Sequence, residues 1–350
     1  MFRTTIRHTL TLSVLALGAA VATAACGDDD DKKNKPGPGV VDDSCPGSQC
    51  EYADSVCLAI GDNEGSDRTD LRINQLNITF PEALKNKFLQ DTVINKAMRI
   101  AYDESCNYSG DGRFSWLFSF DRTSNKLLTG GGPPIENEAA AKNGTCFIQF
   151  TDTDSGIEVK PQELDVTLGD DGSFDVSGID VTVPIFLPTG GSVLLPLKQV
   201  AVKNLPGKAI TDDEGNPSAS GNCIGKYRTN LDPAAACLPE DDISYFENGA
   251  SLEGFITVED AETVWIADLR TSLCVLLGKQ ADDIKASGDD GTHCKRDGDG
   301  NIILKGDWDS ATNSAVEPGT GDAFLLKAEF SASAIKINGT ASKMDCSDAK

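Results

Sequence analysis

The stretch from residue 180 to residue 205 constrains the fold of this chain most, because it carries two long alternating runs. Aliphatic residues recur at every second position over 181–187, Gly190-Gly191 provides a turn, and a second alternating run returns over 193–202. A period of two places one set of side chains on one face of a strand, so we predict an antiparallel hairpin. Three prolines fall within it: Pro184, Pro188 and Pro196. Proline has no N–H to donate to a ladder, so these strands should lie at a sheet edge or be bulged.

Other alternating segments predict strands over 71–80, 113–120, 126–129, 252–257 and 323–337. In the second of these, the aromatic residues fall on one face: Phe114, Trp116, Phe118 and Phe120. Phe114, Trp116 and Phe118 are either plain core or the wall of a ligand cavity, since buried aromatic rows serve both purposes. The predicted fold class is mainly β, an antiparallel sandwich or barrel, with one long and one shorter packed helix and disulfide cross-links.

The two helices are predicted from their caps and apolar spacing. The shorter one runs from Pro81 to about residue 91, with Thr79 as its N-cap. The longer one follows Thr257, reaches Leu277 and stops at Gly278. Its apolar residues recur at intervals of three and four, which indicates one packed face: Trp265, Ile266, Leu269, Leu273, Leu276 and Leu277.

Residues 1–25 have the pattern of a secretory signal. Arg3 and Arg7 precede an apolar run over 10–22, which is shorter than the roughly 20 residues that span a bilayer. Cleavage before Ala25 would give an ordinary secreted protein. Cleavage before Cys26 would give a lipoprotein, because 23–26 resembles a lipobox, although Thr23 stands where an aliphatic residue is usual. We predict that Cys26 is lipidated and anchors the chain to the cell envelope.

Cysteine parity favours the lipoprotein interpretation. The chain has 11 cysteines, and an odd number leaves one thiol unpaired in an oxidising compartment. Without Cys26 the remaining ten can form up to five disulfides: Cys45, Cys50, Cys57, Cys106, Cys146, Cys223, Cys237, Cys274, Cys294 and Cys346. Proximity in sequence suggests pairing Cys106 with Cys146, Cys223 with Cys237 and Cys274 with Cys294, with the other four paired among themselves. A bridge from Cys346 to the N-terminal cluster would then join the two chain ends.

The segment 26–44 lacks the apolar residues needed to offset the entropy of ordering, so we predict a disordered acidic tether. A globular β-rich domain is predicted over 45–350, with a candidate internal boundary near 206–221. Gly27 follows the lipidation site, and by the sorting rules of enteric bacteria the absence of Asp there favours the outer membrane, on its periplasmic or surface face.

The formal net charge is −24, which argues against nucleic acid as a partner, since phosphate backbones are bound by clustered Lys and Arg. It also argues against direct binding of anionic lipid headgroups. The expected partners are the membrane, through the lipid anchor, and a small ligand, glycan or protein. We expect no cofactor, with calcium as the alternative.

The calcium alternative rests on one acidic turn. Asp297, Asp299 and Asn301 resemble the start of a calcium loop. The rest of the EF-hand pattern fails, because Ile302 stands where Gly is needed and Asp309 stands at the last ligand position. The competing interpretation is a hairpin turn, for which Asp-Gly is a favoured pair.

Candidates for catalysis are few. Outside the leader, His293 is the sole histidine, so a Ser-His-Asp triad would have to use it; the alternative is an exposed loop residue. A pair of carboxylates, as in glycan hydrolysis, stays open, but the sequence selects no pair. The sequence therefore favours a protein that is not an enzyme.

Three features together resemble exported lipoproteins of myxobacterial type. They are Cys26-Gly27-Asp28-Asp29, the strand Phe114-Ser115-Trp116-Leu117-Phe118-Ser119-Phe120 with Thr129-Gly130-Gly131-Gly132, and Leu252-Glu253-Gly254 leading to Ser272-Leu273-Cys274-Val275-Leu276-Leu277. The resemblance implies no activity. The favoured function is a non-catalytic cell-envelope lipoprotein with a binding or structural role. The alternatives are a carboxylate-based hydrolase of envelope or extracellular polymers and a calcium-stabilised adhesin.

Overall fold

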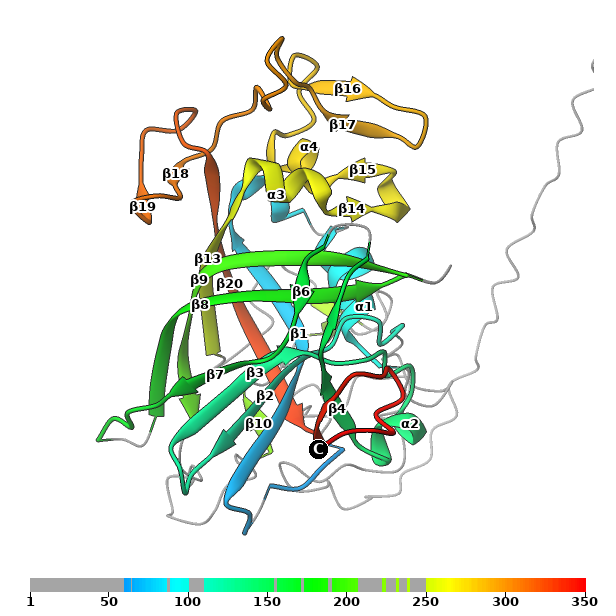
Figure 1. Ribbon diagram of the computed structural model, residues 1–350, viewed down its shortest axis with the longest axis vertical. Coiled ribbons are helices and arrows are strands. Elements are labelled where there is room, and N and C mark those ends of the chain that lie inside the picture. The colour runs from blue at the N-terminus through cyan, green and yellow to red at the C-terminus, as the bar shows by residue number, and fades with distance from the viewer. Residues whose placement is uncertain are drawn as a thin grey trace, which may run out of the picture. The chain divides into compact units, whose positions relative to one another are not determined.

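One antiparallel sheet dominates the computed structural model (Figure 1), which describes residues 60–63, 65–86, 89–100, 110–153, 156–170, 173–187, 191–206, 222–224, 231–232, 238–239 and 250–350. Each strand along its main path is antiparallel to the next. In spatial order the strands are β7 (Gln162–Asp165), β3 (Lys126–Gly131), β2 (Trp116–Asp121), β1 (Arg68–Phe80), β20 (Ala323–Ala334), β13 (Ala250–Thr257), β9 (Ser192–Pro206) and β8 (Ser173–Phe186).

The two ends of this sheet approach each other, so that it forms a nearly closed barrel. Phe114, just before β2, makes an antiparallel bridge with Ile185 of β8. The N–H of Phe186 donates to the carbonyl of Arg113 at 3.0 Å. The mainly antiparallel β class predicted from sequence is therefore confirmed, in its barrel-like form. A barrel of eight strands has an interior that side chains fill or that holds one small ligand.

The hairpin predicted over 180–205 is confirmed as β8 and β9. Their ladder contains three register shifts, all between Phe174 and Val181, whereas Pro184 and Pro196 lie in a stretch that pairs without a shift. Pro184 lies on β8, the last strand of the sheet. Pro196 lies on β9 beyond the part that pairs with β13, which runs from Lys198 to Lys203, so no ladder donor is needed from it on that side. Pro188 lies outside the described residues.

The aromatic row lies in the main core, as its alternation predicts. Phe114, Trp116, Phe118 and Phe120 are all at most 3% exposed. Trp116 stacks on Phe118 with ring centroids 6.2 Å apart, and Phe118 stacks on Phe330 of β20 at 5.8 Å. Burying each such side chain stabilises the fold by about 1.5–3 kcal/mol, so this row is a main contributor to barrel stability.

The prediction of one long helix over 257–277 is wrong. Thr257 does cap a helix, accepting from the N–H of Asp260 at 3.0 Å, but α3 (Val258–Thr263) is short. A small hairpin follows, and a second short helix ends the segment: β14 (Trp265–Ile266), η5 (Ala267–Leu269), β15 (Thr271–Ser272) and α4 (Leu273–Leu277). The helix ends where Val264 becomes extended, at φ −80° and ψ 101°. It does not resume at once, because Arg270 is left-handed at φ 48°; the Ser272 hydroxyl then accepts from the N–H of Val275 and starts a new helix.

Two further details of the helix predictions are corrected. Gly278 ends α4 but is not left-handed; Lys279 and Gln280 take positive φ instead. The shorter helix is also interrupted: η1 (Glu82–Leu84), η2 (Leu89–Asn95) and α1 (Lys96–Met98) replace it. Thr79 does not cap it, because β1 continues through Phe80 and Pro81 occupies the N-cap position.

Two disulfides are described. Cys274–Cys294 is confirmed, with Cα atoms 6.0 Å apart. The other joins Cys146 to Cys346 across 200 residues, so the pairing of Cys106 with Cys146 and the bridge from Cys346 to the N-terminal cluster are wrong. The reason is that β21 (Ile337–Ala341) pairs in parallel with β4 (Thr145–Ile148), which brings the C-terminal residues beside Cys146.

Several predicted features lie outside the described residues. They are the leader at 1–25, Cys26, the tether at 26–44, most of the candidate boundary near 206–221, and the cysteines Cys45, Cys50, Cys57, Cys106 and Cys237. Cys223 lies in β10 (Cys223–Ile224), which pairs with β20. The described residues belong to one compact unit of the chain, 36–350. Among their helices, none is both long enough and apolar enough to cross a membrane.

The remaining helices and strands are short. They are α2 (Glu138–Lys142), β5 (Phe150–Thr151), β6 (Glu158–Val159), β11 (Leu231–Asp232), β12 (Leu238–Pro239), β16 (Lys285–Ser287), β17 (Thr292–Cys294), β18 (Trp308–Asp309) and β19 (Ser314–Ala315).

Candidate ligand cavity

A cavity of about 160 Å³ lies between the barrel and the segments that cover one end of it. From the barrel it is lined by inward residues of β1, β9, β13 and β20, together with Phe114 and Trp116. Leu84, Leu89 and Ala97 line it from the η1–α1 segment. All lining residues are apolar except Arg113 and Lys327. The site is thus a hydrophobic space of the kind that takes small apolar molecules.

The other wall of the cavity comes from residues 258–277, which we call the cover. Figure 1 shows α3, α4 and the β14–β15 hairpin of the cover beyond the end of the sheet where β13 ends. Trp265 and Ile266 from β14 line the cavity, as does Leu273 from α4. The same residues that the sequence assigned to one helix face therefore reach the cavity from a hairpin and a separate short helix.

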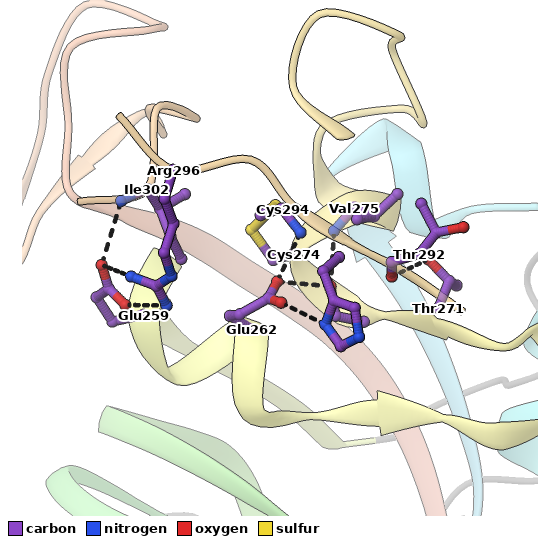
Figure 2. Close-up of a disulfide and its surroundings, with 11 residues drawn as sticks. Glu259, Glu262, Thr271, Cys274, Val275, Thr292, Cys294, Arg296 and Ile302 are labelled. Atoms are coloured by element: carbon purple, nitrogen blue, oxygen red, sulfur yellow. Dashed lines mark hydrogen bonds and ion pairs between the residues drawn. A yellow bond between two sulfur atoms is a disulfide. The ribbon is translucent and has the colours of Figure 1, made fainter. Parts of the chain in front are cut away.

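Glu262 of α3 holds the cover together (Figure 2). Its Oε2 accepts from the Ser272 hydroxyl at 2.7 Å and from the N–H of Cys294 at 2.9 Å. Its Oε1 lies 2.7 Å from Nδ1 of His293. The disulfide between Cys274 and Cys294 ties α4 to β17 beside this carboxylate. Three hydrogen bonds and one covalent bond thus converge where the cover meets β17.

A second carboxylate connects α3 to the loop after β17. Glu259 accepts from Arg296 in two bonds, at 3.1 Å to Nη1 and 2.9 Å to Nη2, as Figure 2 shows. Arg296 also donates to the carbonyl of Gly300 at 2.8 Å. The hydrogen bond from Arg296 lowers the pKa of Glu259. This pair fixes the acidic turn against the cover.

His293 serves this cover rather than a catalytic triad. Its Nε2 lies 2.8 Å from Asp290 and its Nδ1 faces Glu262. Carboxylates only accept, so both ring nitrogens donate, and the hydrogen bonds to Asp290 and Glu262 raise the pKa of His293. The Ser272 hydroxyl donates to Glu262, so in the described part of the chain His293 lacks the serine partner that a triad requires. The His293 ring instead stacks on Trp265 at 5.0 Å.

The acidic turn has hairpin geometry. Asp297 Oδ1 accepts from the N–H groups of Asp299 and Asn301 at 2.9 and 3.0 Å, and Arg296 bridges to Ile302 across the turn. These backbone hydrogen bonds, that from Asn301 first, lower the pKa of Asp297. Calcium at this turn stays a prediction. Elsewhere in the described residues, one group has the spacing of a metal site, Glu262 with Cys274 and Cys294, and its two sulfurs are bonded to each other.

The two cations of the lining differ in their surroundings. Arg113 precedes β2, and its Nη2 hydrogen-bonds to Asp111. Lys96 of α1 lies 3.9 Å from the same carboxylate. Lys327 lies between Leu326 and Ala328, which face the cavity, so its side chain projects from the opposite face of β20. Its ammonium lies there, 3.5 Å from Glu253.

Sequence reasoning identified part of this site. Phe114 and Trp116 line the cavity, whereas Phe118 packs behind them between Trp116 and Phe330. It missed Trp265 and Ile266 as lining residues, and it missed Arg113. One signal was present: Val264-Trp265-Ile266 is a run of strand-favouring residues, and Thr271-Ser272 follows as a cap. Comparison of the chain with protein-family models, with curated proteins and with solved structures gives no match.

Proposed function

We propose that this protein is a lipid-anchored cell-envelope protein whose barrel binds a small apolar ligand without transforming it. The observation that carries the proposal is the apolar cavity of about 160 Å³ at the covered end of the barrel. Its volume is similar to that of an apolar cavity that binds benzene, about 150 Å³. The indole N–H of Trp116 donates to the Thr129 hydroxyl at 3.0 Å. The ring therefore presents an apolar face to the cavity.

The charge pattern favours binding over hydrolysis. A carboxylate-based hydrolase needs two carboxyl groups in its cleft, one with a raised pKa. The residues that line the cavity include no carboxylate. Where their surroundings shift them, the carboxyl groups of the described residues all have lowered pKa values: Asp121, Glu259, Asp282, Asp290, Asp297, Asp322, Asp345 and Asp348.

The location rests on the N-terminal sequence. The signal pattern, Cys26 and the acidic tether favour export and lipid anchoring, with the outer membrane as the proposed destination. The two described disulfides suit an oxidising compartment. Cys26→Ser should abolish incorporation of labelled fatty acid and release the protein from the membrane fraction. Retention in that fraction by an unlipidated Cys26→Ser variant would contradict the anchor.

The cavity is tested by titration with N-phenyl-1-naphthylamine, a neutral apolar dye that fluoresces when it leaves water. The native protein should bind one equivalent. Ala328→Leu adds volume at the lining and should weaken binding at least tenfold, while Ala315→Leu, at an exposed position of β19, should leave it unchanged. Thermal unfolding of each variant checks that the barrel is intact. A native protein that shows no saturable dye binding would refute the proposal.

A further inference from the structure

The charge of the cavity lining is opposite to that of the chain. The chain carries a net charge of −24, yet the charged residues that line the cavity are Arg113 and Lys327, both basic. The ammonium of Lys327 is already paired on the outer face, where it and Lys203 both form ion pairs with Glu253. Arg113 is therefore the cation at this cavity that needs an explanation.

The Arg113 side chain is half-buried, and only part of its hydrogen-bonding capacity is used. It is 18% exposed, and its Nη2 donates to Asp111. A guanidinium carries five N–H donors in a fixed plane. Within the described ranges, no hydrogen bond is made by Nε or Nη1 of Arg113. A half-buried cation with donors to spare, beside an apolar space, is suited to bind an anion.

The local charge count leads to the same conclusion. Asp111 is the acidic partner of both Arg113 and Lys96, whose Nζ is 3.9 Å from the shared carboxylate oxygen. Among the described residues, the ion pairs at Asp111 set two cations against one anion, an excess of about one positive charge beside Arg113. Backbone hydrogen bonds fix the arrangement: the N–H of Asp111 donates to the carbonyl of Lys96, and that of Phe114 to the carbonyl of Ala97, both at 2.8 Å.

We infer that the ligand is a monoanionic amphipath, an apolar chain or ring ending in a carboxylate, with its head group bound by Arg113 and its apolar part in the cavity. The inference rests on the proposed function and names its ligand class. A carboxylate matches the planar guanidinium through two parallel hydrogen bonds. Its single charge also cancels the excess positive charge, whereas a dianion would exceed it. Phe114 and Trp116 then face the apolar part.

Displacement of the bound dye tests this with three ligands that share one eight-carbon chain: octanoate, 1-octanol and octylamine. Octanoate should displace the dye at a concentration at least tenfold below that of 1-octanol, and octylamine should be the weakest. A cavity with no head-group site would favour 1-octanol, because the neutral alcohol leaves water more readily than the carboxylate. The order of the three ligands therefore reports on the head group alone.

Variants then locate the head group. In Arg113→Gln the preference for octanoate should fall to within about twofold, with 1-octanol unaffected. Arg113→Lys keeps the charge without the fork and should retain part of the preference. Lys203→Gln removes a cation that pairs with Glu253 on the outer face and does not line the cavity, so it should change nothing. Should Arg113→Gln fail to fold, Asp111→Asn gives the opposite test, because it adds positive charge and should tighten octanoate binding several-fold.

The outcomes separate the two proposals. A native protein that binds the dye but prefers 1-octanol would overturn the carboxylate inference and leave the cavity function standing. Full preference for octanoate in a folded Arg113→Gln variant would also overturn it. Failure of the dye itself to bind would overturn both.

Discussion

The barrel and its cover are stabilised in different ways. The barrel is built of long strands whose inward residues are buried in one continuous core, such as Phe118, Phe330 and Ile256. The cover consists of elements of two to six residues, each too short to be stable alone. Its residues Leu273–Leu277 are buried in the same core, and the Cys274–Cys294 disulfide and the carboxylates of Glu262 and Glu259 tie it in addition. The ligand space therefore lies between a wall of long paired strands and a wall of short elements that share the same core but need cross-links as well.

The largest effect should come from the barrel. Phe330→Ala removes a fully buried ring that stacks on Phe118 and should cost about 3–5 kcal/mol of unfolding free energy. Urea denaturation followed by far-UV circular dichroism measures it. Ile303→Ala, at a 36% exposed position, should change stability by less than about 0.5 kcal/mol. Equal losses for the two variants would contradict a core-dominated barrel.

Removal of the cover disulfide should have a smaller and local effect. Cys274 and Cys294 are 20 residues apart, for which the loop-entropy model gives about 3 kcal/mol. The double variant Cys274→Ser/Cys294→Ser should show faster amide exchange in α4 and β17 with β1 and β20 still protected. Uniform loss of protection across the barrel would show that the two regions unfold together.

Glu262→Gln should destabilise the cover by less than the loss of its disulfide does. The substitution keeps the shape of the side chain but removes the charge that accepts from Ser272, His293 and the N–H of Cys294. The cost should be about 1–3 kcal/mol, the range for a disrupted buried hydrogen-bonding group. The signal is the near-UV circular dichroism of Trp265. Glu259→Gln, whose side chain is 53% exposed, should cost less than about 1 kcal/mol; a larger cost than that of Glu262→Gln would contradict the model.

The smallest effect should be a pH dependence of the cover. The pKa of His293 is raised by hydrogen bonds to Asp290 and Glu262. The groups that face it from neighbouring elements are Asp290, Glu262 and the Trp265 ring. A raised pKa means that the stabilisation is complete below the unfolded value of about 6.5 and is lost as pH rises through the folded value. Trp265 fluorescence should report loosening over that range, and His293→Gln should abolish the transition.

Sequence reasoning was most successful where one local rule decided the structure. The alternation over 181–187 predicted a strand, and the Thr257 cap predicted the start of α3; both are confirmed. It failed at 264–272, where apolar residues three and four apart also fit a hairpin, and where a left-handed Arg270 and the Ser272 cap decided the outcome. The Cys146–Cys346 bond depends on pairing across 200 residues, for which a single sequence carries no local signal.

The same limit applies to the site. Phe114 and Trp116 were predictable as a buried aromatic row, because alternation places them on one face. Arg113 looked like any polar residue before a strand. Its importance arises from the fold, which places it at the cavity and brings Lys96 of a different element to its acidic partner Asp111.

The position of β20 has a consequence for how the chain assembles. This strand pairs with β1 on one side and β13 on the other, and its Ala334 pairs with Leu71 of β1, more than 250 residues away in sequence. Until Ala323–Ala334 has been synthesised, β1 and β13 each present an unpaired edge, and such edges invite pairing with other chains. Contacts between residues this distant in sequence also slow folding. Closure of the barrel is therefore a late event that follows synthesis of nearly the whole chain, and a nascent chain stays unclosed while its first strands emerge from the ribosome.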